Sequence, residues 1–467
     1  MFEGFVGLAD YPKDSAVAGM MGGEELASLS KALETGSGIV AANATGGQTF
    51  RVQSLEGTLK LATEKSEKEL VLWPKIAKDP AFSTTIEFTR QEDWGEERDL
   101  FVGEVATLPE VEATYKRLAA LVKFMAIKKE VSFASTLVKS IVDPMAQKAH
   151  EGTMQLLRGA EFGFMYGDSG INSLAFDGFL KQITDAATGT NSDIVLDWEG
   201  NPPSEAMLEE AGRIVADHYG YLDYMVMGTR AKSDLTKAMF PYQRTNMPPN
   251  AEGRFGAVLN VYDGSNSVME VKGSRYIRFF RPLSSGMTGA PDQPAGGNVP
   301  TATNAGDSSS QLEDSTTYYY WVGLGLTGIE SAATQCSATT GTSEKITVSI
   351  PDAAFTAGVD ATYANIYRST TNNIATATRI AQVARVGGGN PTTYVDLNQS
   401  RDNCTDAVGF TWAPEVLSIK QLAPLMKMDL AQVTTSLPFL LLLYILPLLF
   451  VPTKCVRIKN IGVLNEA

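Results

Sequence analysis

The segment SFASTLVKSIVDPMAQKAHEGTMQLLRGAEFGFMYGDSGINSLAFDGFLKQI, Ser132–Ile183, is the most informative part of this chain. Asp143 followed by Pro144 predicts a helix start, because Asp accepts hydrogen bonds from free N–H groups and proline is tolerated at the first helical position. No other proline follows until Pro202. We therefore expect a helix from Pro144 to about Tyr166, roughly 35 Å long at 1.5 Å per residue. One face carries Ala149, Thr153, Leu156, Ala160 and Phe164 at helical spacing.

Further sequence blocks accompany this helix. FMYGD at Phe164–Asp168 is followed by LAFDGF at Leu174–Phe179, and LAPLMK at Leu422–Lys427 and LAQ at Leu430–Gln432 precede VRIKN at Val456–Asn460. This ordered set resembles the major capsid proteins of tailed bacteriophages with the Hong Kong 97 fold, in particular those of large myoviruses of Gram-positive hosts. The resemblance implies an α+β fold in which the helix is the long spine helix. Its marker residues here are Asp143, Pro144, Leu156 and Phe164.

The overall composition describes a folded chain. It has 467 residues, of which 44% are hydrophobic and 20% are charged. Such a chain is expected to form about two to four domains. The net charge of −14 weighs against a dedicated nucleic-acid binder, which needs concentrated Lys and Arg to contact phosphates. The acidity fits a shell that encloses DNA and contacts it only non-specifically.

Residues 82–131 are expected to form two extended arms with a charged tip between them. Thr84–Thr89 alternates as a strand does, and Tyr115–Val131 is the return arm. From Glu87 to Glu112 the chain has nine acidic and two basic residues. In the resembled fold this is the extension loop, whose tip contacts a neighbouring subunit. We assign that contact to Glu92, Asp93, Trp94, Glu96, Glu97 and Arg98. The alternatives are an ordinary solvated surface and, for Trp94, packing onto its own hairpin.

Periodicity and end signals predict further elements before residue 284. Helices are expected at Glu24–Leu33, at Leu55–Leu72, from the cap Ser204 to Asp217, and at Ala231–Phe240. Strands are expected at Tyr221–Met227, Val258–Tyr262 and Tyr276–Phe280. The mixture of helices and strands over residues 204–283 is what the axial domain of the resembled fold requires.

The composition changes abruptly at Ser284. From Ser284 to Glu344 there is no Lys or Arg, and Gly, Ser, Thr, Ala and Pro dominate. Short strands separated by turn formers are expected at Thr317–Leu324, Lys345–Ile350, Ala364–Arg368, Arg379–Val386 and Thr392–Asp396. This pattern is typical of a β-sandwich. It resembles an immunoglobulin or fibronectin type III module, which we interpret as an inserted all-β domain, either exposed on the outer surface or stabilising contacts between capsomers.

These observations predict a division of the chain into six parts. They are an N-terminal arm and helix (1–80), the extension loop (81–131), the peripheral domain with the spine helix (132–203), the axial domain's first part (204–283), the inserted β-sandwich (284–410) and the axial domain's C-terminal part (411–467). Some members of the family lose part of the arm to a protease. We expect the arm to be retained here.

The strongest apolar run is LPFLLLLYILPLLFVP, Leu437–Pro452. It contains three prolines and is shorter than the roughly 20 residues that a membrane-spanning helix needs. Membrane insertion is therefore disfavoured, and a buried strand or a short buried helix is expected. The N-terminus MFEGFVGLADYPKD has no basic region and no long apolar core, so no secretory signal is expected.

No catalytic, cofactor or metal site is predicted. Gly167-Asp168-Ser169-Gly170 copies the start of a serine-protease motif, but such a site needs a histidine base, and neither His150 nor His218 has a suitable context. We expect a helix end and turn there, and His218 at the end of its own helix. Gly387-Gly388-Gly389-Asn390 lacks the Lys of a phosphate loop. Cys336, Cys404 and Cys455 have no zinc-ligand spacing. A Cys336–Cys404 disulfide is conceivable, whereas reduced thiols suit a cytoplasmic product.

The resemblance implies a structural protein rather than an enzyme: a major capsid protein assembled in the host cytoplasm into hexamers and pentamers of a phage head. A scaffolding protein, a portal and decoration proteins are the expected partners, and no membrane is involved. The first alternative is an encapsulin-like nanocompartment shell, although such shells usually lack an inserted β-domain. A surface adhesin with a fibronectin-like module is the second alternative, and an enzyme is the third.

Overall fold

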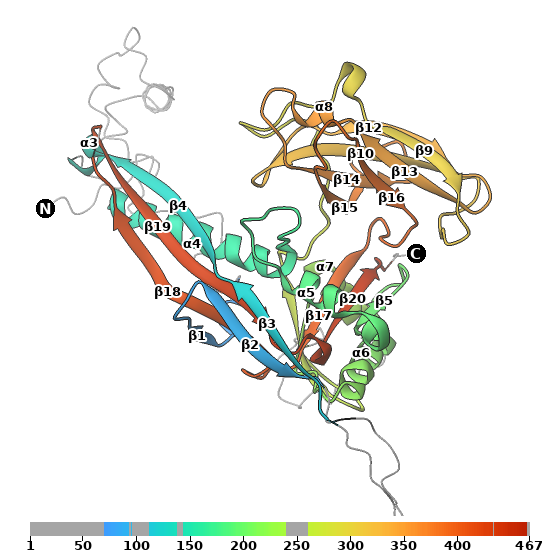
Figure 1. The fold of residues 1–467 in the computed structure, drawn as a ribbon, viewed down its shortest axis with the longest axis horizontal. Helices are drawn as coiled ribbons and strands as arrows, with labels where there is room; N and C mark the ends of the chain where they lie inside the picture. Colours follow the sequence, from blue (N-terminus) through green and yellow to red (C-terminus); the bar gives the residue numbers. More distant parts are fainter. Residues whose placement is uncertain are drawn as a thin grey trace, which may run out of the picture. The chain divides into compact units, whose positions relative to one another are not determined.

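The computed structural model describes residues 70–92, 95, 112–137, 143–239, 260–432 and 434–464. The helix predicted at Glu24–Leu33 and most of the one at Leu55–Leu72 lie outside these ranges. Residues 70–72, the predicted end of the second helix, are described and are not helical. Helices and strands are mixed along the described chain, as an α+β fold requires (Figure 1).

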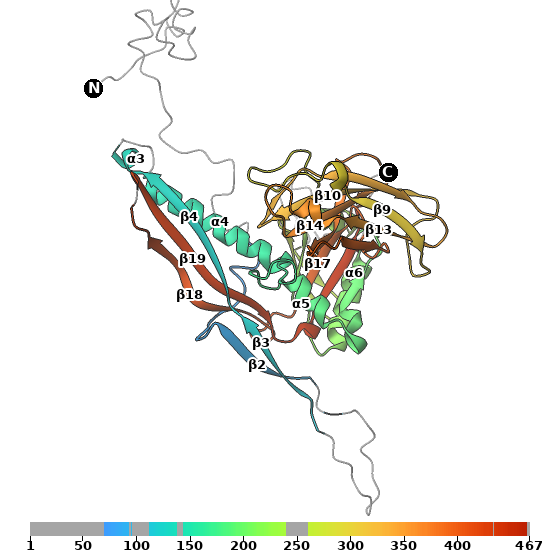
Figure 2. The ribbon, with the colours of Figure 1, turned by 45° about the horizontal axis from the view of Figure 1, so that its top comes forward.

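A four-stranded sheet lies beneath the longest helix (Figures 1 and 2). Its strands, in spatial order, are β1 (Lys78–Pro80), β18 (Leu417–Asp429), β19 (Ser436–Leu449) and β4 (Lys123–Ser132). The helix α4 (Pro144–Tyr166) has the expected bounds and packs on β4 and β19. At Gly152 a Cβ atom would lie 2.5 Å from Cδ1 of Leu441. Glycine therefore permits the close approach of the helix to the sheet.

The apolar run Leu437–Pro452 forms most of β19. Of the two structures expected for it, a buried strand or a short buried helix, the strand is the one formed. Within it, Leu441 pairs with Ile127 of β4 on one side and with Lys427 of β18 on the other. No helix among the described residues is both long and apolar enough to cross a membrane. The sequence groups residues 411–467 with the axial domain, but β18 and β19 join the sheet under α4 instead. A central strand needs hydrogen-bonded neighbours on both sides, and β4 supplies one of them.

A second, six-stranded sheet has the spatial order β5, β20, β17, β6, β8, β7. The strands are β5 (Val195–Asp197), β20 (Cys455–Ile461), β17 (Thr405–Phe410), β6 (Tyr224–Gly228), β8 (Val268–Ser274) and β7 (Val261–Asp263). The helices of this region are α5 (Phe179–Ala186), α6 (Glu205–Asp217) and α7 (Thr229–Met239), with the short helix η3 (Gly189–Ile194). Pairing is parallel between β6 and β8 and between β20 and β5, and antiparallel elsewhere.

The prediction for this region needs two corrections. Tyr276–Phe280 is not a strand. β8 ends at Ser274, and Phe280 packs edge to face against Phe162 and Tyr166 of α4 instead of joining the ladder. Ser204 lies at the start of α6 but makes no side-chain capping hydrogen bond. Helix α6 itself has the expected extent.

Residues 301–396 form two antiparallel sheets, which we call the two-sheet unit. One sheet contains β10 (Thr317–Leu326), β11 (Ile329–Glu330), β12 (Thr334–Thr339), β14 (Tyr363–Ser369) and β15 (Thr378–Ala384); the other contains β9 (Thr301–Gly306), β13 (Glu344–Ile350) and β16 (Thr392–Asp396). The short helices are η5 (Gly296–Asn298) and α8 (Asp352–Phe355). All five strands predicted in this region are present, but β9, β11 and β12 were not predicted.

The predicted insertion ended at residue 410, and this boundary is wrong. Thr405–Phe410 is β17, which pairs with β20 and β6 at the centre of the six-stranded sheet. β17 and the strands of the two-sheet unit have similar apolar sequences, so composition does not separate them.

The apolar core is divided in the same way. One continuous cluster contains α4, α5, α6 and the four- and six-stranded sheets, with Phe164, Met225 and Leu443 fully buried. The two-sheet unit has its own cluster, to which both of its sheets contribute, for example Val322, Ile346 and Ile366. A small third cluster around Trp321, Tyr367 and Phe280 connects the two-sheet unit to the segment that leads into it.

Candidate functional site

The predicted arms of residues 82–131 form a hairpin of two strands. β2 (Thr85–Gln91) pairs with β3 (Tyr115–Leu121) from Thr85↔Leu121 to Gln91↔Tyr115 and with no other strand of the described chain. The return arm is divided at Val122, which is buried and donates its N–H to the Thr84 carbonyl at 2.8 Å. Beyond it, β4 belongs to the four-stranded sheet. The predicted single arm is therefore two strands with different partners.

One face of the hairpin is attached to the body of the subunit. The rings of Phe88 and Phe450 meet edge to face with centroids 5.1 Å apart. Arg90 donates from Nη1 to the Phe450 carbonyl at 3.3 Å, and Ile86 packs against the main core. The opposite face is exposed to solvent, because side chains alternate along each strand. Thr85, Glu87 and Thr89 of β2 are all exposed there.

The hairpin and the adjoining elements expose large apolar side chains. The exposed fraction is 96% for Phe82, 64% for Tyr115, 54% for Leu121 and 61% for Phe124. An isolated two-stranded hairpin is at best marginally stable in water. Two of these side chains, Tyr115 and Leu121, lie on the solvent-exposed face of the hairpin itself. We did not predict these residues; the sequence signal was a large apolar residue on the strand face opposite Leu118 and Ala120.

Of the predicted tip residues, only Glu92 lies among the described residues. Its carboxylate pairs with Arg90 at 2.8 Å and with Lys116 at 2.6 Å. Lys116, followed by Arg90, holds the pKa of Glu92 below its ordinary value. Within one subunit Glu92 is thus paired inside its own hairpin, not left free for a neighbour. Asp93, Trp94, Glu96, Glu97 and Arg98 lie outside the described residues.

The marker residues of α4 have the expected positions. Asp143 Oδ1 accepts a hydrogen bond from the Met145 N–H at 3.0 Å, and Pro144 is the first helical residue. Leu156 and Phe164 are buried in the main core. The Phe164 ring stacks on Trp73 with centroids 6.1 Å apart and an interplanar angle of 9°. The apolar face of α4 thus holds the segment that precedes β1.

A buried carboxylate reinforces this contact and was not predicted. Glu161 of α4 accepts backbone hydrogen bonds from Val71 and Leu72 at Oε1, 2.9 and 2.7 Å long, and from Trp73 at Oε2, 2.9 Å long. Burial raises the pKa of Glu161, while the three N–H donors act in the opposite direction. A single Glu on an otherwise apolar helix face was the available sequence signal.

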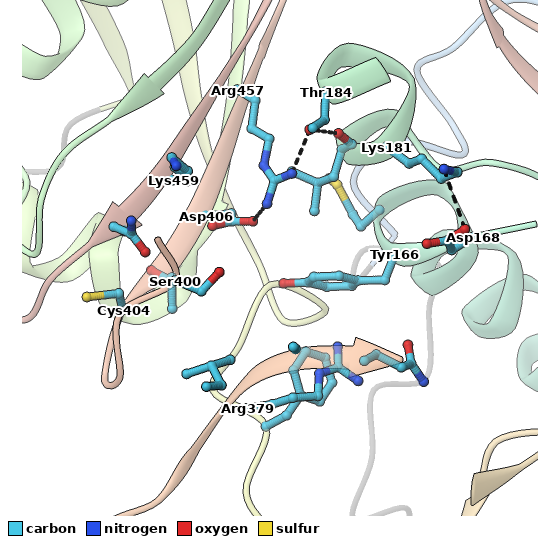
Figure 3. Close-up of a pocket in the computed structure, with 18 of the residues that line it drawn as sticks. Tyr166, Asp168, Lys181, Thr184, Arg379, Ser400, Cys404, Asp406, Arg457 and Lys459 are labelled. Carbon is cyan, nitrogen blue, oxygen red and sulfur yellow. Dashed lines mark hydrogen bonds and ion pairs between the residues drawn. The ribbon is translucent and has the colours of Figure 1, made fainter. Parts of the chain in front are cut away.

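A cavity of about 390 Å³ lies where the C-terminal end of α4, α5, β15 and β20 meet (Figure 3). Tyr166 points into it, with Arg379 and Arg457 on different sides of the ring. Positively charged residues predominate in the lining. They are Lys181, Arg278, Arg379, Arg401, Arg457 and Lys459, whereas the acidic lining residues are Asp168, Asp185 and Asp406. These residues come from separate parts of the chain, and no sequence motif joins them.

The glycine-containing segment after α4 and His218 occupy a turn and a helix end, respectively. Gly167-Asp168-Ser169-Gly170 is the turn after α4, in which Asp168 Oδ1 accepts the Gly170 N–H at 2.8 Å. His218 lies at the C-terminal end of α6, and its Nε2 is 2.9 Å from Asp193 Oδ1.

The three cysteines are free thiols, so the pairing of Cys336 with Cys404 is not formed. Burial raises the pKa of each thiol to about 12. Within the described ranges no group of His, Cys, Asp and Glu is arranged to hold a metal ion.

No protein-family model matches the chain. The major capsid proteins of Staphylococcus phage K and Staphylococcus phage S25-3 are each 24% identical to it over 456 residues, which cover 92% of this chain and 94% of the relative. Among solved structures, the capsid of a native GTA particle matches with a TM-score of 0.46 and 10% identity, covering 91% of this chain and 98% of the other. The sequence relatives match this chain along almost its whole length. The chain is therefore a homologue of the major capsid proteins of phages.

Proposed function

We propose that this chain is the major capsid protein of a tailed phage. Many copies form hexamers and pentamers that tile an icosahedral head around double-stranded DNA. The role is structural, and we assign no catalytic group. With a net charge of −14, the shell holds its DNA by enclosing it, because close binding of phosphates requires concentrated positive charge.

Each part of the chain has a proposed place in this assembly. The β2–β3 hairpin with its tip is the extension loop, α4 and the four-stranded sheet form the peripheral domain, and the six-stranded sheet forms the axial domain. The two-sheet unit is an inserted immunoglobulin-like domain at the capsid surface. A scaffolding protein, a portal and decoration proteins are the proposed partners.

The observation that carries the proposal is the incomplete hairpin. It has two strands only, and it exposes Tyr115 and Leu121 by more than half of their surface, 64% and 54%. A neighbouring subunit that covers this face would bury those side chains. Each such contact is modest, but closed symmetry repeats it in every subunit of the shell. Assembly therefore completes a surface that the single subunit leaves open.

The test is a pair of substitutions that differ only in location. Leu121→Asp places a charge on the exposed face of the hairpin, and Val395→Asp places the same charge on an exposed position of the two-sheet unit, where Val395 is 43% exposed. We expect Leu121→Asp to abolish closed shells while the subunit stays folded, and Val395→Asp to assemble normally. Electron microscopy with light-scattering mass, in the presence of scaffolding protein, measures both.

Two outcomes would contradict the proposal. Normal shells from Leu121→Asp would show that the hairpin face is not an assembly contact. Failure of the unmodified chain to form any shell, tube or ring with its scaffolding protein would contradict the capsid role itself. The cargo of native particles separates a phage head, which contains nuclease-protected genomic DNA, from a nanocompartment shell, which contains an enzyme.

A further inference from the structure

The cavity in Figure 3 contains positive charge that the subunit does not neutralise. Six cationic and three anionic side chains line it, an excess of three positive charges. Four of the cations have partners. Arg457 binds Asp406 at 2.7 Å and the Thr184 hydroxyl at 2.7 Å. The other three partnered cations are Lys181, paired with Asp185 at 3.1 Å, Lys459, paired with Asp197 at 3.1 Å, and Arg401, which donates to the Glu199 carbonyl at 2.6 Å.

Arg278 and Arg379 are different. The guanidinium group of neither residue forms an ion pair or a hydrogen bond with any residue in the described part of the chain. Both contact the ring of Phe280, with the guanidinium carbon of Arg379 3.9 Å and that of Arg278 5.7 Å from its centroid. Stacking on an aromatic face orients a guanidinium group but leaves its N–H edge available for an anion. The cavity therefore has two oriented cations without a counter-ion.

Two hydroxyl groups face the same space. Tyr166 and Ser400 line the cavity, and neither hydroxyl has a hydrogen-bond partner among the described residues. Burial raises the pKa of Tyr166, and Asp406 adds to the rise. Arg379, Arg457 and Arg278 lower it. The guanidinium carbon of Arg379 is 5.8 Å from the centroid of the Tyr166 ring, Arg457 lies on the other side of that ring (Figure 3), and Arg278 lines the same cavity.

We infer that this cavity binds a small phosphate-type oxyanion, with Arg278, Arg379 and the Tyr166 hydroxyl as its principal donors. A tetrahedral oxyanion accepts hydrogen bonds from several directions at once, whereas a carboxylate has two oxygens in one plane. The volume is within the range of about 300–1,000 Å³ that is typical of ligand sites. The ligand would connect Arg379 of the two-sheet unit with Tyr166 of α4 and so stabilise their junction. The inference does not depend on the capsid role.

Isothermal titration calorimetry of the purified full-length subunit with pyrophosphate, and separately with inorganic phosphate, tests the inference. We expect saturable binding by the unmodified chain. The double substitution Arg278→Ala with Arg379→Ala should weaken it by roughly tenfold or more, because charge-assisted hydrogen bonds are the strong ones. Arg213→Ala is the matched control. It removes the same charge from α6, where Arg213 pairs with Glu210 and Asp217 outside the cavity, and should leave binding unchanged.

Tyr166→Phe is a second variant that keeps the ring packing and removes only the hydroxyl. It should weaken pyrophosphate binding several-fold with an unchanged melting temperature. This variant tests the inference even if the double variant fails to fold. No saturable binding at millimolar pyrophosphate, or equal binding by all variants, would overturn the inference. Binding of a short DNA oligonucleotide or of the acidic peptide 91–99, without saturable binding of pyrophosphate, would overturn it as well.

Discussion

The two-sheet unit and the β2–β3 hairpin are both antiparallel β-structure, but they are stabilised in different ways. The two-sheet unit encloses its own core and buries an ionic network. Arg368 binds Asp396 at 2.8 Å and Asp402 at 3.0 Å, and Tyr320 donates to the same Asp396 carboxylate at 2.7 Å. The hairpin has two strands, one anchored face and one face of exposed apolar side chains.

The difference shows where each region obtains its stabilising contacts. The two-sheet unit buries its apolar side chains in a core of its own and pairs the buried Arg368 with Asp396, so its main stabilising contacts lie within the single subunit. The hairpin lacks a second layer, and apolar burial is the main favourable term in folding. Under the proposed function, a neighbouring subunit supplies its remaining contacts. Substitutions in the two-sheet unit should therefore affect mainly folding. Substitutions on the exposed face of the hairpin should affect mainly assembly.

The largest effect on folding is expected for Arg368→Ala in the two-sheet unit. Removing one partner of a buried pair leaves Asp396 charged and buried, which costs about 3–5 kcal/mol of unfolding free energy. Hydrogen exchange of β10, β14 and β16 measures the loss. Lys345→Ala is the control, since the Lys345–Asp307 pair is partly exposed and solvent-exposed ion pairs contribute little to stability. Equal losses from both substitutions would contradict the internal stabilisation of this unit.

A smaller effect is expected for Phe88→Ala at the anchored face of the hairpin. The edge-to-face contact with Phe450 is lost, and such aromatic pairs contribute about 0.5–1.5 kcal/mol beyond the buried area. Faster hydrogen exchange should be confined to residues 85–91 and 115–121. Thr89→Ala on the exposed face should leave the exchange unchanged. Faster hydrogen exchange in the two-sheet unit as well would show that the stability of the two regions is coupled.

A pH-dependent effect is expected for Glu330→Gln. Burial raises the pKa of Glu330 above its ordinary value of 4.5, while the hydrogen bond from the Tyr367 hydroxyl acts oppositely. Because the folded-state pKa exceeds the unfolded one, this stabilisation is complete in acid and is lost as pH rises through the folded-state pKa. The unfolding free energy of Glu330→Gln should therefore increase relative to that of the unmodified chain as pH rises from 4.5. A constant difference from pH 4 to 8 would refute the raised pKa.

The smallest effect on folding is expected for Tyr115→Ser. The side chain is 64% exposed, and surface substitutions usually change the unfolding free energy by less than about 0.5 kcal/mol. Under the proposed function, the same substitution should nevertheless lower the yield of closed shells. Denaturant unfolding and light-scattering mass are measured on one sample. Impaired folding together with normal assembly would contradict the conclusion that the exposed face of the hairpin serves assembly rather than folding.

Local signals predicted the regular elements well. Asp143 and Pro144 located the start of α4, because an N-cap and a first-turn proline act within a few residues of the chain. The strands of the two-sheet unit followed from apolar runs between turn formers. β9 and β12 were missed because their residues are small and polar. Such residues form strands here only because β13 and β10 lie beside them.

The candidate sites were less predictable. The charged tip follows directly from composition, but the exposed side chains Phe82, Tyr115 and Leu121 carry no motif. The cavity joins α4, α5, β15 and β20, which are up to several hundred residues apart in sequence. Glu161 could be recognised as unusual on an apolar helix face, but its three N–H donors come from a segment some 90 residues earlier.

The sequence by itself determined the long helix, the strands of the hairpin, the change to β-structure after Ser284 and the likeness to phage capsid proteins, because these depend on short-range periodicity, composition and the order of motifs. The tertiary structure decided which strands share a sheet. It placed β17 in the six-stranded sheet, β18 and β19 under α4, and Arg278 and Arg379 beside Tyr166. The physical reason is that backbone pairing and charge neutralisation are satisfied by whatever lies nearest in space, at any separation along the chain.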